Sequence, residues 1–157
     1  MPDDWITPTG DVDHGVWTQE WQARNDNLGD YANELIHPGW GGFLDLTHAS
    51  LSCDKIRVYL NGIGAGGLIN VFDIDLFYNG MWNDLYQGNM SKLVWVEFAI
   101  GSTEDVTAMR IRAQNNGVVD GRIRLHEADF NQVPAPVSKK WWFNLSGRPD
   151  REIVAVL

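Results

Sequence analysis

The chain has 157 residues, 44% of them hydrophobic, and a formal net charge of −9. This length suits one domain with a sizeable core. The acidity argues against nucleic acid or an anionic membrane surface as a partner, because both attract clustered Lys and Arg. A single cysteine, Cys53, rules out an intrachain disulfide.

Residues 1–15 form an acidic N-terminal segment without the apolar stretch of a signal peptide. No run approaches the roughly 18 apolar residues that cross a membrane. We therefore expect synthesis in the cytoplasm without an export signal, and no membrane partner. The following residues, 17–26, predict a short turn of helix or an irregular strand.

Apolar and polar residues alternate with a period of two along most of the chain, which predicts strands with one buried face. An Asn-Gly turn at 79–80 predicts a hairpin over 71–87. Strands of this kind pair antiparallel and stack face to face, so we expect an all-β sandwich. The expected strands are 55–60, 71–78, 93–100, 107–114 and 121–130.

Charged residues occupy the outward positions of these strands, with the acidic residues on some strands and the arginines on others. If the acidic and basic strands are neighbours, the charges form cross-strand pairs worth a few tenths of a kcal/mol each on a solvated face. A face that binds sugar acids is the alternative. The residues concerned are Asp73, Asp75, Glu97, Arg110, Arg112, Arg122, Arg124 and His126.

The alternation stops near Phe130. Residues 132–157 begin as a Pro-containing linker and end in an apolar strand, so we expect an extended C-terminal arm. An exposed apolar strand is an aggregation hazard, and it should therefore pack on its own domain or on a neighbouring subunit.

Catalytic patterns are weak in this sequence. The glycine-rich run 62–67 is not followed by a helix that could hold a phosphate. Asp73 and Asp75 share one face of a strand, so they cannot flank a substrate as glycosidase carboxylates do. We therefore predict a protein that is not an enzyme. A carbohydrate-active enzyme stays as an alternative that would need convergent carboxylates from different elements.

The order of segments over residues 16–131 resembles the galactose-binding-like jelly roll of discoidin domains, coagulation-factor type C domains and carbohydrate-binding modules. It is especially similar to short versions found in tailed-phage virion proteins. The segments are WQARNDNLGDYANELI, GWGGFLDL, CDKIRVYL, VFDIDLFYNGMWNDLY, KLVWVEFAIGSTEDVTAMRIRAQNNG and GRIRLHEADF. The resemblance implies an eight-stranded antiparallel jelly-roll β-sandwich without a catalytic centre, which binds ligands on loops at one end.

The resemblance also implies a structural Ca²⁺ ion near the first strands, held by oxygen ligands. Carried over by position, its candidate ligands are Asn25, Asp26, Asp30 and Glu127. Asn25 stands where an aspartate is expected, which departs from the family pattern. The alternative is an Asx-rich turn that holds no metal and is closed by side-chain to backbone bonds.

Three aromatic residues are candidates for ligand binding: Tyr31, Trp40 and Trp82. Tyr31 and Trp40 lie on early loops, where an exposed ring can stack on a sugar. A Trp40 ring that plugs the end of the sandwich is the equal alternative, and a packing role is favoured for Trp82.

Together these features predict a phage virion accessory protein, such as a decoration, tail or fibre component on the virion surface. It would attach to other virion subunits, or to copies of itself, through the arm of residues 132–157, and it would recognise glycans. The alternative is a free-standing, lectin-like carbohydrate-binding module.

Overall fold

The computed structural model describes residues 3–64, 68–134, 140–141 and 153–154. The strands are β1 (Trp5–Ile6), β2 (Gly10–Asp13), β3 (Trp17–Thr18), β4 (Ala32–Ile36), β5 (Gly39–Trp40), β6 (Leu44–Gly64), β7 (Ile69–Tyr78), β8 (Met81–Asn89), β9 (Trp95–Asn115), β10 (Gly121–Gln132), β11 (Lys140–Trp141) and β12 (Ile153–Val154), and the helix is the 3-10 turn η1 (Glu20–Arg24). No described helix is long and apolar enough to cross a membrane.

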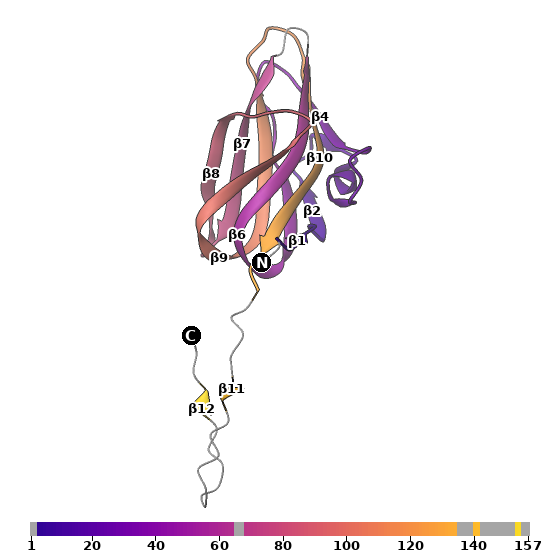
Figure 1. Ribbon diagram of the computed structural model, residues 1–157. Coiled ribbons are helices and arrows are strands. Elements are labelled where there is room, and N and C mark those ends of the chain that lie inside the picture. The colour runs from indigo at the N-terminus through magenta and orange to yellow at the C-terminus, as the bar shows by residue number, and fades with distance from the viewer. Residues whose placement is uncertain (1–2, 65–67, 135–139, 142–152, 155–157) are drawn as a thin grey trace, which may run out of the picture.

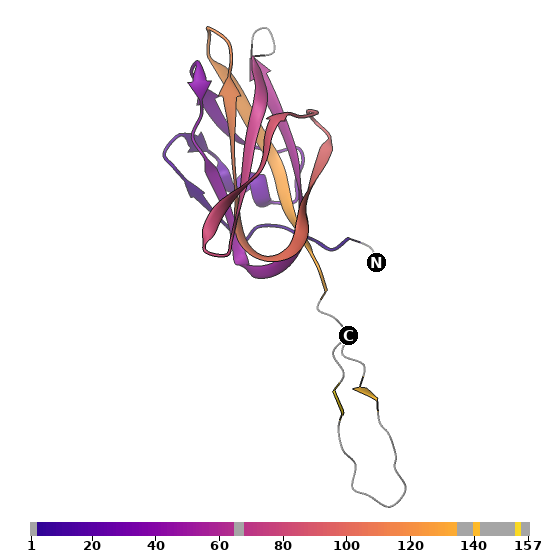
Figure 2. The same cartoon turned by 90° about the vertical axis from the view of Figure 1, so that its left-hand side faces the viewer.

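Ten of the strands form one continuous antiparallel sheet that folds into two layers (Figures 1 and 2). The first layer contains β2, β5, β7 and β8, with residues 44–47 of β6 and 106–115 of β9. The second contains β1, β3, β4 and β10, with residues 53–64 of β6 and 95–99 of β9. The predicted all-β jelly roll is confirmed, with ten strands in place of the expected eight.

β6 and β9 belong to both layers because each bends partway along its length. The register between them shifts twice, between Thr47 and Leu51 and between Cys53 and Lys55. Such irregularities increase the bend and twist of a strand. The sequence predicts two separate strands at 93–100 and 107–114, whereas the structure joins both runs in β9.

The core lies between the layers and is built from the inward positions of the long strands. Phe72, Ile74 and Leu76 of β7 face Ile56 and Leu60 of β6, among others, and all five are at most 1% exposed. The predicted hairpin at 71–87 is β7 and β8, with Asn79 and Gly80 at the positive φ angles of 53° and 78° that the turn requires.

The expected C-terminal arm lies largely outside the described residues. Within it, β11 pairs with β12 in a separate two-stranded sheet. The predicted helical turn at 17–26 corresponds to η1.

Candidate functional site

Two arginines of β9 are stacked between aromatic rings on the outer face of the first layer. The guanidinium carbon of Arg112 lies 4.5 Å from the ring centroid of Trp40 and 4.3 Å from that of Phe43. The corresponding distances from Arg110 are 4.1 Å to Phe43 and 4.4 Å to Trp82. These five side chains, which we call the stacked ladder, share one face because alternate residues of a strand point the same way.

Each arginine of the stacked ladder also holds a buried aspartate of β7. Arg112 donates from Nη2 to Asp73 Oδ2 at 2.7 Å, and Arg110 does the same to Asp75 at 2.7 Å. Asp73 and Asp75 are only 4% and 7% exposed. Burial raises the pKa of Asp75, while the bond from Arg110 opposes that rise. The expected cross-strand pairs are present, but their carboxylates are buried, not solvated.

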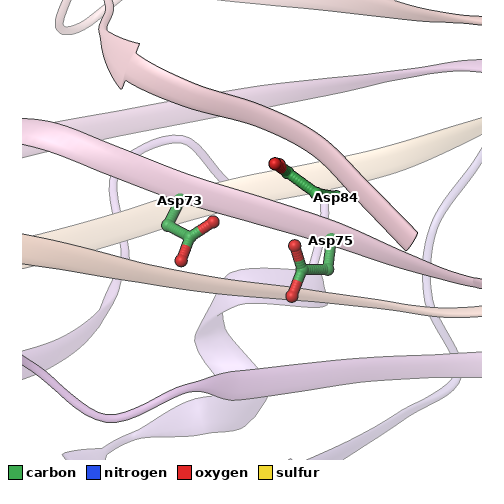
Figure 3. A group of neighbouring side chains, drawn as sticks. All are labelled: Asp73, Asp75 and Asp84. Atoms are coloured by element: carbon green, nitrogen blue, oxygen red, sulfur yellow. The ribbon is translucent and has the colours of Figure 1, made fainter. Parts of the chain in front are cut away.

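Asp73, Asp75 and Asp84 form a cluster that could hold a metal ion, since one oxygen from each lies within 4.8 Å of the others (Figure 3). The first two come from β7 and the third from β8. Because Arg110 and Arg112 already occupy an oxygen of each buried aspartate, much of the charge that would attract a cation is offset.

The three aromatic candidates from the sequence do not converge on one site. Trp40 and Trp82 lie on the stacked ladder, where the Trp82 ring also meets Phe77 edge-on at 5.3 Å. Tyr31 lies beside the second layer, where its ring centroid is 4.3 Å from the guanidinium of Arg124. Trp82 therefore packs on the outer face of the sheet. Trp40, at the other end of the stacked ladder, is 38% exposed to solvent.

Trp40 lies at the end of the sandwich where the loops 37–43 and 115–121 meet. Asn115 ties these loops together, because its Nδ2 donates to the carbonyls of Ile36 at 2.9 Å and Val119 at 2.8 Å. His37 Nδ1 lies 2.7 Å from Asp120 Oδ1. A ring held on loops that are fixed in this way is suited to stacking on a ligand with little loss of entropy.

A buried carboxyl group supports the Trp40 loop from inside the sandwich. Glu34 is 3% exposed, and its Oε1 accepts a 2.8 Å bond from the Gly42 N–H while Oε2 has no partner. A Cβ at Gly41 would stand 2.6 Å from Oε2, so this position needs glycine. Burial raises the pKa of Glu34 from 4.5 to about 7, and the charge of Asp13 adds to the rise.

A second buried carboxyl group, Glu127, lies on β10 near the turn at residues 25–30. It is 2% exposed and neither oxygen has a hydrogen-bond partner of normal geometry. Burial, then the charge of Asp129, raises its pKa to about 7, although the Asp26 N–H opposes this. Thr7 bridges Asp26 and Asp129, with Oγ1 distances of 2.7 and 3.3 Å.

The four predicted metal ligands are divided between two roles. Asp26 lies near Glu127, as expected for a shared site. Asn25 and Asp30 instead close the turn, in which Asp30 Oδ2 accepts bonds from Nδ2 of Asn25 at 3.2 Å and of Asn27 at 2.9 Å. The Asx turn weighed as an alternative is also present, since Oδ1 of Asn25 accepts from the Asn27 N–H and Oδ1 of Asn27 from the Gly29 N–H, each at 3.0 Å.

Sequence reasoning missed several of these residues. Glu34 lies in the run ANELI, two residues from Ala32 and two from Ile36. Alternation along a strand therefore already places its side chain on the same inward face as theirs. Phe43 directly precedes a buried strand and gives no signal of its contact with two arginines. Long-range partners such as Thr7 with Asp129 leave no trace in local pattern.

No protein-family model and no curated protein matches the chain. Solved structures do match. The family 32 carbohydrate-binding module of C. perfringens NanJ, in complex with galactose, is 13% identical with a TM-score of 0.57, over 82% of this chain and 91% of that one. The family 32 module of AlyQ, in complex with 4,5-unsaturated mannuronic acid, is 12% identical with a TM-score of 0.57, over 83% and 99%. The C-terminal domain of a chitobiase from Bacteroides fragilis is 13% identical with a TM-score of 0.59, over 83% and 98%.

These matches establish the galactose-binding-like jelly-roll fold, which confirms the resemblance found in the sequence. At such low identity they establish the fold alone.

Arg112→Met should lower the free energy of unfolding, because it leaves the buried carboxylate of Asp73 without a counterion. We expect a loss of about 2 kcal/mol, below the roughly 3–5 kcal/mol of a fully buried pair, since the Arg112 side chain is 28% exposed. Urea denaturation at neutral pH measures it. The double variant with Asp73→Asn should recover part of the loss, and a single variant as stable as the parent would contradict the assignment.

Glu34→Gln should stabilise the protein above neutral pH and leave its stability unchanged near pH 4.5. The folded state keeps a proton on Glu34 that the unfolded chain releases between pH 4.5 and about 7, so this group's contribution to stability falls as pH rises through that window. The gain above the window should be on the order of 3 kcal/mol. Urea denaturation at both pH values tests this, and a gain that is equal at both would contradict it.

Proposed function

We propose that the protein is a non-catalytic carbohydrate-binding module that holds glycans at the loop end beside Trp40. The observation that carries this proposal is the half-open Trp40 ring, fixed on one side by Arg112 at 4.5 Å. The apolar face of a pyranose stacks on such a ring, and neighbouring polar groups bond its hydroxyls. His37 and Asp120 are exposed polar groups on the same loops.

The fold supports binding over catalysis. Two of the matched structures are described as complexes with sugars, galactose in one and an unsaturated mannuronic acid in the other. In this chain the buried aspartates Asp73 and Asp75 are paired with arginines, which suits structural support more than proton transfer.

A role as an accessory protein on a phage particle is the more specific proposal. It rests on the sequence resemblance to virion proteins and on the apolar end of the arm at residues 132–157. In that role the arm would hold other virion subunits or a second copy of the chain, and the sandwich would present the glycan site at the virion surface.

We further propose that Glu127 and Asp26 hold a structural Ca²⁺ ion. The residues fit a hard cation, because the described residues supply no donor of normal geometry to the two buried oxygens of Glu127, and Asp26 adds a carboxylate from the turn at 25–30. An ion bound there would offset the mutual repulsion of Glu127, Asp129 and Asp26. Asn25 and Asp30 would contribute by keeping the turn closed.

A glycan array of the purified protein tests the proposed function. We expect a sugar signal that Trp40→Ala reduces by tenfold or more, because the stacking surface is lost. Trp21→Ala is the matched control, since Trp21 on η1 is 54% exposed and belongs to no site proposed here. A blank array with folded protein would rule out the binding role.

Removal of residues 133–157 separates the two versions of the proposal. If the protein is a free-standing module, binding should survive removal of residues 133–157. If it is a virion component, the shortened chain should lose attachment to partner subunits, which size-exclusion chromatography of the assembly would reveal.

Calcium should raise the melting temperature of the protein at pH 7.5. At concentrations well above the dissociation constant the rise should be on the order of 5 °C. Glu127→Gln should abolish the shift, whereas Glu34→Gln, which alters the other buried glutamate, should retain it. Identical melting with calcium and with a chelator would contradict the site.

A further inference from the structure

Arg122 and Arg124 differ from the other arginines on the outer faces of the sandwich. Arg57, Arg110 and Arg112 each form an ion pair with an aspartate on a neighbouring strand. Within residues 3–64 and 68–134, no carboxylate forms an ion pair with Arg122 or Arg124. In a chain of net charge −9, two neighbouring cations without acidic partners are unusual.

The two arginines project from β10 on the outer face of the second layer. They are two residues apart on one strand, so their Cα atoms are about 7 Å apart and their side chains point the same way. Arg122 is exposed and lies between Leu35 of β4 and Ile63 of β6, which are 44% and 36% exposed.

Amide and phenol groups complete this surface. Arg124 lies between Asn33 and Asn61 in the sheet register, and its guanidinium stacks on the Tyr31 ring at 4.3 Å. Asn33 Oδ1 accepts a 3.0 Å bond from Arg122 Nη1, which steadies that guanidinium and leaves its other N–H groups free. The buried Nε of Arg124 finds no hydrogen-bond partner among the residues that the structure describes.

We infer that this surface, which we call the β10 arginine face, binds the carboxylate of an acidic glycan built from uronic acids. The inference rests on the proposed function and assigns a ligand class to a second surface, distinct from the Trp40 loop end. Arginine forms paired N–H bonds to a carboxylate, and the amide of Asn61 is placed to bond a sugar hydroxyl, since that of Asn33 already bonds Arg122 and Thr18. Leu35, Ile63 and Tyr31 offer apolar contact to the ring.

Charge complementarity favours this occupant over a neutral sugar. The positive charges of Arg122 and Arg124 stand unopposed on their own face, whereas the equivalent arginines of the first layer are neutralised. A carboxylate ligand would supply the counterion that β10 lacks. The face begins at Gly121, where the loop 115–121 enters β10.

Titration calorimetry with oligogalacturonate, and with the same oligomer after reduction of its carboxylates to alcohols, tests the inference. We expect the parent protein to prefer the acidic form, and Arg122→Gln to weaken its binding by tenfold or more. Lys55→Gln is the matched control, because it removes the same charge from the same layer where Lys55 is already paired with Asp3 and Glu97. It should change binding less than twofold.

Equal affinity for the acidic and the reduced oligomer, or equal losses in Arg122→Gln and Lys55→Gln, would overturn the inference. If neutral sugars bind in a Trp40-dependent manner but the acid form is not preferred, the proposed function stands and this inference fails. If neither form binds and the glycan array is blank, both fail. Arg122 is exposed, so its replacement should leave the melting temperature unchanged, and that measurement accompanies each titration.

Discussion

The pairing of β6 with β9 is the constraint on which the rest of the structure depends. These strands pair in the first layer, where Leu44 lies opposite Ile111, and again in the second, where Val58 lies opposite Val96. Because one pair of strands serves both layers, its register decides which side chains face outward on each. A slip of one residue would turn Arg110 and Arg57 into the core and would break both sets of ion pairs.

Local pattern predicted the strands, the hairpin and an all-β sandwich, because period two directly reports which face is buried, whereas the jelly roll was implied by the family resemblance. It could not predict the bends in β6 and β9, since these arise from register shifts between distant residues. It also misjudged Asp73 and Asp75, which occupy outward positions yet are buried. Arginines of β9 pair with them, and rings from β5 and from the hairpin strand β8 stack on those arginines, so β5 and β9 bring their part of this cover from far away in the sequence. The candidate ligands on irregular segments, such as Asp26, were proposed from the family resemblance.

The two buried glutamates, Glu34 and Glu127, are similarly buried but have different neighbours. Both have a pKa raised to about 7, chiefly by loss of water. Glu34 keeps one bond from the Gly42 N–H and supports the loop of Trp40. Among the described residues, Glu127 has no donor within normal geometry and faces further carboxylates, so the proposed cation would offset the charge that it carries above its pKa. Glu34 has one acidic neighbour, Asp13, whereas Glu127 has two, Asp129 and Asp26.

The β10 arginine face is the corresponding case for positive charge, because its arginines lack a carboxylate partner among the described residues. A net charge of −9 repels an acidic polymer at long range, but salt at physiological strength screens that repulsion beyond about 8 Å. At contact distance, the charges that matter are those within a few ångströms, and there the face presents Arg122 and Arg124 without a carboxylate. Added salt weakens both the distant repulsion and the local attraction, so the salt dependence of binding is an ambiguous measure. Removing the carboxylates of the ligand mainly removes the local attraction to the arginines. Comparing the acidic and the reduced oligomer therefore tests that attraction more directly than a change of ionic strength does.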